Sequence, residues 1–402
     1  MSELSYLEKL LDGVEVEWLP LGNVTKYEQP TKYLVKAKDY HDTFSIPVLT
    51  AGKTFILGYT DETHGIYEAS KTPVIIFDDF TTASKWVDFD FKAKSSAMKM
   101  ITSSDDIRFS LKYVYYWLNT LPSELVDGDH KRQWISNYAQ KKVPVPCPAN
   151  PEKSLAIQAE IVRILDKFTE LTAELTAELT LRKKQYNYYR DKLLSFEECE
   201  VEWKTLDEVA SFRRGSFPQP YGNSEWYNGE GCMPFVQVAD VADFGFRLHR
   251  STKQQISKLA QSKSVFVEAG TVIVSLQGTI GRVALTQYDC YVDRTLAIFT
   301  KYKAAVNKKY FAHQLKAKFD LEKEFARGST LKTITKEEFS KFQIPIPPLE
   351  VQNRIVALLD KFDRLTHSIE EGLPRELELR QKQYEYYREL LFSFPKLEAA
   401  SN

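Results

Sequence analysis

The sequence predicts a mixed α/β protein with two sheet-containing domains, separated by a pair of long antiparallel coiled-coil helices in a pseudo-two-fold symmetric arrangement. Three observations lead to this prediction: an internal repeat, apolar residues at helical spacing inside the repeat, and strand-like runs between its copies. Residues 155–171 (LAIQAEIVRILDKFTEL) return as residues 349–365 (LEVQNRIVALLDKFDRL), and residues 181–196 return as residues 379–394 with 11 of 16 positions identical. Because a period of roughly 190 residues is far too long for a solenoid unit, each half is expected to be a whole domain plus a helix.

The chain is expected to begin with the tail of the helical repeat, residues 1–13. Residues 6–11 (YLEKLL) precede VEVEW just as residues 189–194 (YRDKLL) precede CEVEW in the second half. The final copy of the repeat stops where this beginning would continue it. The two ends of the chain are therefore expected to lie close together.

Residues 14–150 and 198–346 are each expected to form a globular domain of mixed α/β structure with a dominant sheet. Short apolar and aromatic runs bounded by Gly, Asp, Thr and Pro predict the strands. In the first domain these are residues 44–49, 55–59 and 73–77, with a helix at 111–118. In the second domain the expected strands are 233–238, 264–276 and 296–302, with helices at 252–261 and 308–319.

Residues 151–197 and 347–396 are expected to form the two helical spacers, followed by a tail at 397–402. Alternating prolines before each spacer (VPVPCP and IPIPP) predict stiff extended segments, since proline fixes φ and lacks an N–H. Apolar residues at 3–4 spacing predict coiled-coil helices, the first about 40 residues long and so roughly 60 Å at 1.5 Å per residue. Glu-Gly-Leu-Pro at 371–374 is expected to interrupt the second, because Gly ends one helix and Pro begins the next.

A four-residue tandem repeat, TAEL, lies inside the first helix at residues 172–179. Each copy would lengthen a helix by about 6 Å and rotate its end by roughly 40°. The duplication is either an ordinary stretch of solvated coiled coil or a ruler that sets the distance between the domains. The residues that would carry the spacer role are Thr172, Leu175, Thr176 and Leu179.

Composition favours a folded protein of the reducing cytoplasm. No run reaches 18 apolar residues, and the N-terminus lacks the pattern of a secretion signal. The four cysteines lie far apart without a C-x-x-C pair, which disfavours a disulfide framework or a zinc site. The net charge of −1 conceals a partition, because residues 205–345 hold 20 Lys and Arg against 14 Asp and Glu, and residues 19–150 hold 16 against 15. Phosphate affinity is therefore expected on the globular parts.

Catalytic motifs are not found, so the chain is not expected to be an enzyme or to bind a metal or cofactor. Ala-Gly-Lys-Thr at 51–54 lacks the first glycine of a phosphate-binding loop, since Pro47 stands at that position. Glu-Trp-Lys at 202–204 is similar to part of a nuclease motif, but the equivalent residues of the first half end in Leu19. The six histidines show no metal-ligand spacing, and neither a base-methylation loop nor a glycine-rich cofactor turn is present.

Polar and basic loops in both globular regions are the candidate DNA-binding elements. Arg and Gln side chains can pair with base edges, and backbone N–H groups of Gly, Ser and Thr can bind phosphates. One such loop is usually only solvated, but three recur at matched places in two divergent domains. The candidates are Lys26, Tyr27, Lys85, Trp86, Lys131 and Arg132 in the first domain, and Arg213, Arg214, Ser216, Gln277, Thr279, Arg282, Arg327, Ser329, Thr330 and Lys332 in the second. Replacing Arg282 or Arg327 by alanine is expected to weaken DNA binding without unfolding the protein.

Several of these motifs resemble the specificity (S) subunit of type I restriction-modification systems, most closely the type IC branch. The matching segments are P-x-P-P-L-E-x-Q-x-x-I-V-x-x-L-D-K-F at 345–362, L-R-x-K-Q-Y-x-Y-Y-R in both helix copies, R-G-S-T at 327–330 and the TAEL tandem. The resemblance covers the whole chain. The first proline segment departs from the family pattern by an insertion in VPVPCPANPEKSL.

The resemblance implies a non-catalytic DNA-recognition subunit in which each globular domain is a target-recognition domain for one half of a split target. It implies that the helices set the spacer and dock two methyltransferase (M) subunits, with restriction (R) subunits as further partners and no membrane. S-adenosylmethionine, ATP and Mg²⁺ would be used by those partners and not bound by this chain. The setting would be a bacterial or archaeal cytoplasm.

Two readings of the helices stay open at this point. Six tyrosines of the repeat could dock partner subunits, or they could pack the seam between the helices: Tyr186, Tyr188, Tyr189, Tyr384, Tyr386 and Tyr387. Of these, Tyr186, Tyr189, Tyr384 and Tyr387 are the docking candidates. A coiled-coil structural adaptor that binds proteins instead of DNA is the alternative from a different functional class. Binding to random duplex DNA, with and without a methyltransferase partner, would separate the two.

Overall fold

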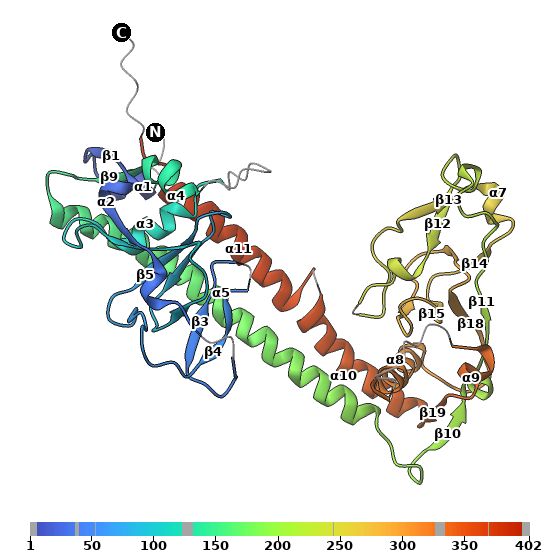
Figure 1. Cartoon of the computed structure of the whole chain (residues 1–402). Coiled ribbons are helices and arrows are strands. Elements are labelled where there is room, and N and C mark those ends of the chain that lie inside the picture. The colour runs from blue at the N-terminus through green and yellow to red at the C-terminus, as the bar shows by residue number, and fades with distance from the viewer. Residues whose placement is uncertain are drawn as a thin grey trace. The chain divides into compact units, whose positions relative to one another are not determined.

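The computed structural model describes residues 6–36, 40–52, 54–122, 132–243, 245–325, 334–368 and 370–395 (Figure 1). The chain divides into two compact units. Unit 1 comprises Met1–Ala173 with Leu379–Asn402, and unit 2 comprises Glu174–Glu378. The helices α5 (Pro151–Leu194) and α11 (Gly372–Leu391) each contribute one part to each unit. The predicted mixed α/β class, with two sheet-containing domains joined by long helices, is confirmed.

Unit 1 contains three small sheets. The largest has the order β2-β8-β5-β6 and is formed by Thr25–Glu28, Met98–Ser103, Val74–Asp78 and Ser84–Val87. A second sheet has the order β4-β3-β7, from Ile56–Thr60, Ile46–Leu49 and Lys92–Ala93, and β3 and β7 run parallel. The third pairs β1 (Val16–Pro20) with β9 (Lys142–Pro146). Short helical elements complete the unit: α1 (Tyr6–Leu11), α2 (Leu21–Val24), η1 (Pro30–Tyr33), α4 (Gln133–Ser136) and η2 (Tyr138–Gln140).

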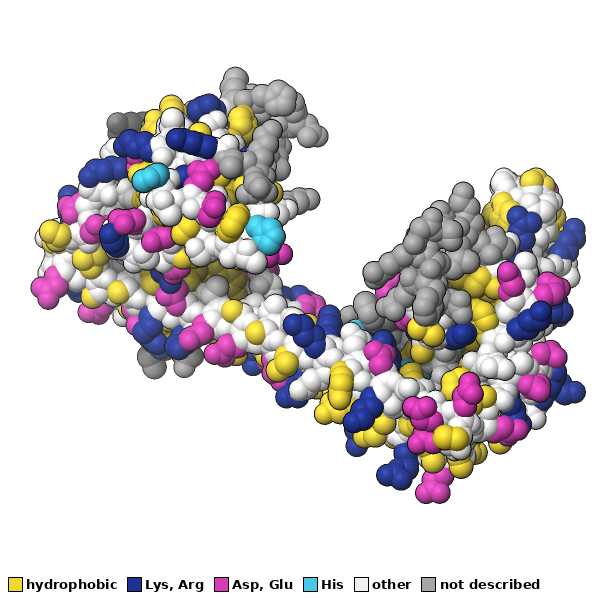
Figure 2. Space-filling view, turned by 60° about the horizontal axis from the view of Figure 1, so that its bottom comes forward, with side chains coloured by type: hydrophobic (Ala, Val, Ile, Leu, Met, Phe, Trp, Pro, Cys, Tyr) yellow, Lys and Arg dark blue, Asp and Glu magenta, His cyan; other side chains and the backbone are white. Residues whose placement is uncertain are grey.

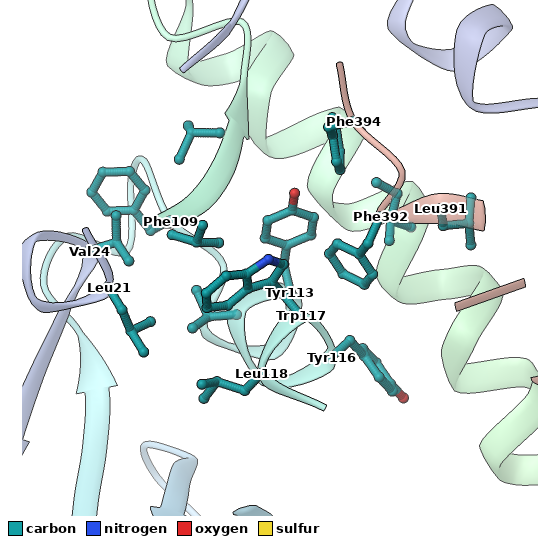
Figure 3. Packing of buried hydrophobic residues seen from close by; sticks show 14 of the residues in the cluster. Leu21, Val24, Phe109, Tyr113, Tyr116, Trp117, Leu118, Leu391, Phe392 and Phe394 are labelled. Carbon is teal, nitrogen blue, oxygen red and sulfur yellow. The ribbon is translucent and has the colours of Figure 1, made fainter. Parts of the chain in front are cut away.

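One core joins the helix α3 (Leu111–Leu118) of unit 1 to both ends of the chain. Figure 3 shows Tyr113 and Trp117 of α3 beside Leu391, Phe392 and Phe394 from the end of α11. The ring centroids of Tyr113 and Phe392 are 5.1 Å apart. Leu7 and Leu11 of α1 belong to the same core. The predicted proximity of the two ends is confirmed, because α1 and the end of α11 share one set of buried contacts.

Unit 2 repeats this plan. Its first sheet has the order β11-β18-β15-β16, from Ala210–Arg214, Leu296–Tyr302, Val272–Ser275 and Val283–Leu285. Its second has the order β13-β12-β17-β14, from Gln254–Ile256, Met233–Val236, Cys290–Val292 and Val265–Val267, and β12 and β17 run parallel. A third pairs β10 (Glu202–Thr205) with β19 (Gln343–Ile346). The helical elements are α6 (Leu206–Val209), η3 (Ser224–Trp226), η4 (Val238–Asp240), α7 (Lys258–Gln261), α8 (Lys308–Phe325), α9 (Lys336–Ser340) and α10 (Leu349–His367).

Strand pairing gives a correspondence between the two large sheets, interrupted by one register shift between Ser211 and Phe212 in unit 2. Tyr27 pairs with Ile101 in unit 1, and Phe212 pairs with Phe299 in unit 2. Further along the same strands, Phe77 pairs with Lys99 and Val274 pairs with Ala297. Lys99 of the first domain therefore occupies the place of Ala297 in the second.

A pair of buried glutamines repeats the attachment of each domain to its helix. In unit 1 the Gln158 Oε1 accepts a hydrogen bond from the Ser110 N–H at 2.9 Å, just before α3. In unit 2 the Gln352 Oε1 accepts one from the Asn307 N–H at 2.8 Å, just before α8. Both glutamines are almost fully buried. The two copies of the sequence repeat thus make the same contact in the two units.

The sequence predicts extended proline segments but not their partners. VPVP lies in β9 and IPI lies in β19, and each strand pairs antiparallel with the strand that contains the repeated Glu-Trp. Each pair forms a two-stranded sheet, so every strand keeps one unpaired edge where a missing proline N–H costs no hydrogen bond. The strand that enters each domain, with the repeated Glu-Trp, and the proline strand that leaves it are therefore paired side by side.

Two secondary-structure predictions are wrong. Residues 264–276 were expected as one strand but form β14 and β15, which belong to different sheets. Residues 252–261 were expected to form a helix, but residues 254–256 form the strand β13 and only Lys258–Gln261 form the short helix α7. Gln254 and Gln255 pair with Phe235 and Pro234 of β12, so pairing with a neighbouring strand overrides the helical pattern. The Ser257 side chain accepts a hydrogen bond from the Ala260 N–H and begins α7 there.

The two long helices meet inside each unit. In unit 1, Phe168 of α5 stacks on Tyr387 of α11 with ring centroids 5.3 Å apart. In unit 2, Tyr189 of α5 stacks on Phe362 of α10 at 5.8 Å. The chain is interrupted between α10, which ends at His367, and α11, which begins at Gly372 with φ +77°. The break falls at the predicted Gly, and the 44-residue length of α5 agrees with the expected 40.

Candidate nucleic-acid interface

Four segments converge at one end of the large sheet of unit 2. The Leu276 N–H, after β15, donates to the Thr295 carbonyl, between β17 and β18, at 2.9 Å. The Ile334 N–H donates to the Leu276 carbonyl at 3.3 Å, and the Arg214 guanidinium, at the end of β11, donates to the Ile334 carbonyl at 3.4 Å. This convergent end therefore joins two of the predicted polar loops with the loop at residues 293–295.

The end of β11 presents one exposed arginine and one anchored arginine. Arg213 is exposed and makes no ion pair with any residue in the described ranges, whereas Arg214 is half-buried and bonded to Ile334. Gly215 follows, and a Cβ there would lie 2.1 Å from the Val292 carbonyl oxygen, so only glycine fits. The Ser216 hydroxyl donates to the Lys263 carbonyl at 3.1 Å. Arg213 is thus the residue of this segment best placed to meet a ligand.

Arg294 is a candidate that the sequence analysis missed. It is exposed at the convergent end, with its guanidinium carbon 5.3 Å from the ring centroid of Tyr221. The Tyr221 hydroxyl donates to Oδ2 of the buried Asp293 at 2.5 Å, and burial together with this bond raises the pKa of Tyr221. Thr295 donates to the other oxygen of Asp293 through its N–H and its hydroxyl. Tyr221, which is itself held by Asp293, therefore supports the Arg294 guanidinium. Only the isolated Asp-Arg-Thr in a loop could have signalled it.

The loop between β15 and β16 places its three candidates differently. Gln277 is half-buried beside Leu276 at the convergent end, and Thr279 is exposed. Arg282 donates to the Val241 carbonyl at 3.0 Å and forms an ion pair with Asp243 at 2.5 Å. Its guanidinium therefore fastens the loop after η4 to the sheet, which gives Arg282 a structural role in addition to any DNA contact.

Unit 1 has the same convergent end with different side chains. The Asp79 N–H donates to the Ala97 carbonyl at 3.1 Å, and the Gln133 N–H donates to the Asp79 carbonyl at 2.9 Å. These bonds reproduce the Leu276–Thr295 and Ile334–Leu276 bonds of unit 2. Arg132, at the start of α4, and Phe80, in the loop between β5 and β6, are exposed there. The two domains therefore present different residues on one backbone frame.

The sequence suggests matching Lys26 and Tyr27 with residues 213–217, and residues 83–86 with residues 277–282, and the structure corrects both matches. By strand pairing, Lys26 and Tyr27 of the first domain are equivalent to Ser211 and Phe212 of the second, and not to Arg213 and Arg214. By the same pairing Lys85 corresponds to Ala284, two residues beyond Arg282. For Lys26 and Tyr27 the sequence already held the correct match, since Tyr27 follows Trp18 by nine residues and Phe212 follows Trp203 by nine. For Lys85 it did not, because the loops between Tyr27 and Lys85 and between Phe212 and Ala284 differ in length.

Exposure separates the remaining candidates of unit 1. Lys26, Tyr27 and Lys85 are exposed. Trp86 packs against the core, with its ring 6.0 Å from that of Tyr115 and its indole N–H donating to Asp88. Trp86 therefore serves mainly in packing. Lys131, Arg327, Ser329, Thr330 and Lys332 lie outside the described residues.

The TAEL tandem lies within the unbroken helix α5. The Thr172 hydroxyl donates back to the Phe168 carbonyl at 2.7 Å, and Leu175 and Leu179 are half-buried. Thr176 is exposed. Inserting or deleting one TAEL unit would therefore lengthen or shorten α5 by four residues.

Two of the four docking candidates, Tyr189 and Tyr387, are 44% and 40% exposed, and the other two are buried or half-buried. Tyr186 is 7% exposed and packs on Phe362 and His367, and burial raises its pKa. Tyr384 is likewise half-buried against the core of unit 1. The expectation of docking is corrected for Tyr186, because little of its surface remains for a partner. Tyr188 and Tyr386 are 62% and 63% exposed and occupy equivalent places in the repeat.

Charged side chains of the described residues are mostly paired or dispersed. Figure 2 shows acidic and basic side chains interspersed over the visible face. A cleft of about 440 Å³ in unit 2 is lined by Lys183, Arg190, Arg282 and Lys316, and the last three are each paired with an aspartate. Within the described ranges no cluster of His, Cys, Asp and Glu could hold a metal ion, and no helix is long and apolar enough to span a membrane.

Comparison with known proteins identifies the family. A model of the type I restriction modification DNA specificity domain matches residues 199–379. The type I restriction enzyme EcoR124I/EcoR124II specificity subunit of Escherichia coli is 61% identical over 411 residues, covering 100% of both chains. A putative type I restriction enzyme specificity subunit of Haemophilus influenzae is 30% identical over 405 residues, covering 97% of this chain and 98% of the relative.

Solved structures agree in fold. The type I restriction-modification S subunit of M. genitalium superposes with a TM-score of 0.59 at 16% identity, covering 96% of this chain and 98% of that one. A chain from a structural study of type I R-M complex assembly also gives a TM-score of 0.59, at 18% identity and with 94% and 97% coverage. The sequence relatives, the matched domain and the fold point to one conclusion, which also removes the adaptor alternative: the chain belongs to the specificity subunits of type I restriction enzymes.

Proposed function

We propose that this non-catalytic DNA-recognition subunit reads a split target, one half with the convergent end of each domain. The helices would fix the gap between the halves and dock two methyltransferase subunits, with restriction subunits as further partners. Adenine methylation and cleavage would then be carried out by those partners, with S-adenosylmethionine, ATP and Mg²⁺ bound by them and not by this chain. The complex would act in the bacterial cytoplasm.

The observation that carries this proposal is the repeated convergent end. The same backbone hydrogen bonds join three residues in each domain. These are Leu276, Thr295 and Ile334 in one domain, and Asp79, Ala97 and Gln133 in the other. The exposed side chains around the two frames differ: Arg213 and Arg294 in one, Tyr27 and Arg132 in the other. A shared frame with unlike side chains is what two readers of unlike sequences require, because base edges are distinguished by side-chain donors and acceptors.

The docking role is supported by the surface of the helices. Tyr188 with Leu181 and Tyr386 with Leu379 are exposed apolar residues seven positions apart, so each pair lies on one face of its helix. The two pairs occupy equivalent positions in the repeat. Two equivalent surfaces on one chain suit two copies of the same partner.

The test is to sequence methylated positions in DNA from cells that carry this chain with its methyltransferase and restriction subunits. A two-part motif with an unspecified gap is expected. Gel shifts with duplex containing that motif, with and without the methyltransferase subunits, then measure binding directly. A continuous motif, or methylation that is independent of this chain, would contradict the proposal.

A further inference from the structure

A fully buried ion pair lies beneath the convergent end of the first domain. The ammonium of Lys99, on β8, is 3.3 Å from Oδ2 of Asp79, which follows β5, and both side chains are 0% exposed. The contact is an ion pair by distance but not an aligned hydrogen bond, since neither Lys99 Nζ nor Asp79 Oδ2 has a hydrogen-bond partner among the described residues. Burying two charges with incomplete hydrogen bonding is costly, so the pair needs an explanation other than stability.

The second domain shows that the fold does not need these charges. The place of Asp79 is taken by Leu276, and the place of Lys99 is taken by Ala297. The backbone bonds to residues 295 and 334 are nevertheless the same as those to residues 97 and 133. The frame therefore forms around apolar residues in one domain and around an ion pair in the other.

Asp79 links two segments of the DNA-reading end. Its Oδ1 accepts a hydrogen bond from the Trp134 N–H in α4 at 2.9 Å, while its backbone joins Ala97 and Gln133. The equivalent N–H in the second domain belongs to Thr335 and is bonded by Glu338 within its own capping box. The acceptor for this N–H therefore lies in the loop between β5 and β6 in the first domain, whereas in the second domain it lies in the helix itself.

Lys99 supports the exposed aromatic ring of the same surface. Its ammonium lies 5.1 Å from the ring centroid of Tyr27, which is 44% exposed. In the second domain the equivalent Phe212 packs on Phe299 and Phe339 instead. A cation under one face of a tyrosine ring fixes the ring while its edge and hydroxyl stay accessible.

We propose that Asp79 and Lys99 are positioning residues for DNA recognition by the first domain. Asp79 fixes the loop after β5 and the start of α4, and Lys99 fixes the ring of Tyr27, so the reading surface is rigid before DNA arrives. Neither residue touches DNA. This inference rests on the proposed reading of a split target, and it assigns the pair to one half of that target alone.

The test compares the double variant Asp79→Asn/Lys99→Met with the unaltered chain in the complete complex. Asparagine keeps the acceptor for the Trp134 N–H and methionine keeps most of the aliphatic volume, so the variant should melt within a few degrees of the unaltered chain. Methylation of the target motif is expected to fall at least tenfold. The methylated sites that remain should show relaxed sequence in one half of the motif only.

Two matched controls make the result specific. Glu62→Gln/Lys92→Met removes another ion pair of the same domain, between the buried Lys92 and the partly buried Glu62, and should leave the motif unchanged. Lys92 also donates to the His64 carbonyl. Arg294→Ala should relax the opposite half. The single variant Lys99→Met leaves a buried carboxylate unpaired and should lower the melting temperature, which checks that the pair is buried in solution.

Each outcome decides the matter. An unaltered motif and rate in the double variant would overturn the inference, as would relaxation of both halves. A double variant that fails to fold would also overturn it, because the pair would then serve stability. If the unaltered chain itself directs no two-part motif, the proposed function fails, and that result is separate from the behaviour of the variant.

Discussion

At the scale of single residues, the two domains differ most where side chains are exposed at their convergent ends. The Arg294 side chain is exposed but held in position, because the Tyr221 ring lies under its guanidinium and Asp293 holds Tyr221. A guanidinium held in this way can form two hydrogen bonds to one guanine with little loss of side-chain entropy.

Arg294→Ala is expected to weaken binding of target duplex by roughly 10- to 100-fold, since a bidentate base contact is worth about 1–3 kcal/mol. The matched control is Lys301→Ala, an exposed lysine near the far end of β18, which begins just after Arg294. Fluorescence anisotropy with labelled duplex measures both. Equal losses in the two variants would indicate a general charge effect instead of recognition.

A second residue-scale prediction concerns pH. Burial lowers the pKa of His313 on α8 to about 3, and its ring packs 4.5 Å from that of Phe246. The unfolded chain has a histidine pKa near 6.5, so it binds a proton below that pH while the folded chain does not. Stability is therefore lost as the pH falls from about 6.5 towards 3, by about 2 kcal/mol at pH 5.

Urea unfolding at pH 7 and pH 5 tests this linkage. The loss of stability on acidification should be smaller in His313→Leu than in the unaltered chain, because the variant lacks the group that the unfolded state protonates. Carboxylates contribute equally to both proteins and cancel in the difference. Identical losses in the two proteins would show that His313 is accessible to protons in the folded state.

Residue-level prediction from sequence succeeded in part. Arg213, Lys26 and Tyr27 are exposed, as a binding role requires, whereas Trp86 and Tyr186 turned out to be packed in cores. Their aromatic rings satisfy the helix and strand patterns equally well inside or outside, so the pattern alone does not decide exposure. Arg294 was missed because its value depends on Tyr221, which lies 73 residues earlier in the chain.

At the scale of elements, the attachment of helix to domain is the feature repeated most faithfully. Gln158 accepts from the Ser110 N–H and donates to the Arg108 carbonyl and the Ser154 hydroxyl. It therefore connects α5 directly to the first turn of α3. Such a buried carboxamide, with its hydrogen bonds made, fixes where one helix crosses another.

Gln158→Ala is expected to lower the free energy of unfolding by about 1–3 kcal/mol, because the Ser110 N–H and the Arg108 carbonyl lose their partner in a buried place. Denaturant unfolding gives the value. Gln383→Ala, at an exposed position of α11, is the control and should change stability by less than about 0.5 kcal/mol. A loss of similar size in both would mean that the attachment is not its cause, since alanine has a higher helix propensity than glutamine and cannot destabilise either helix in that way.

Elements whose residues interact locally were predicted most accurately from sequence. The helix at 111–118 was placed to the residue, because Ser110 supplies the cap and the apolar spacing is regular. The strand β13 was mistaken for a helix since its pairing partner, β12, lies outside the local sequence pattern, with Phe235 paired to Gln254. The pairing of each Glu-Trp strand with a proline strand was missed for the same reason.

At the scale of the whole molecule, the sequence repeat predicted the two-domain plan and the helices that join the domains. What it could not supply was the register between the domains, where loops of unequal length shifted Lys85 against Arg282. The boundaries at 150, 197 and 346 stay predictions, since the compact units divide α5 and α11 internally.

Deleting residues 176–179 is expected to shorten the preferred gap in the DNA target by one or two base pairs. The helix α5 is unbroken through this segment, so it would lose about 6 Å, compared with about 3.4 Å per base pair. Sequencing of methylated sites reports the gap, and a length-preserving replacement of TAEL by AAEL in the second copy is the control. The ruler interpretation would be rejected if the gap stayed the same.

The core of unit 1 also has a consequence for synthesis. Leu391, Phe392 and Phe394, almost the last described residues of the chain, complete a core whose other members include Tyr113 and Leu11. A ribosome therefore makes most of the first domain long before it makes the segment that seals it. The domain translated first is finished last, and a nascent chain that stops before α11 would leave an apolar surface open on α3.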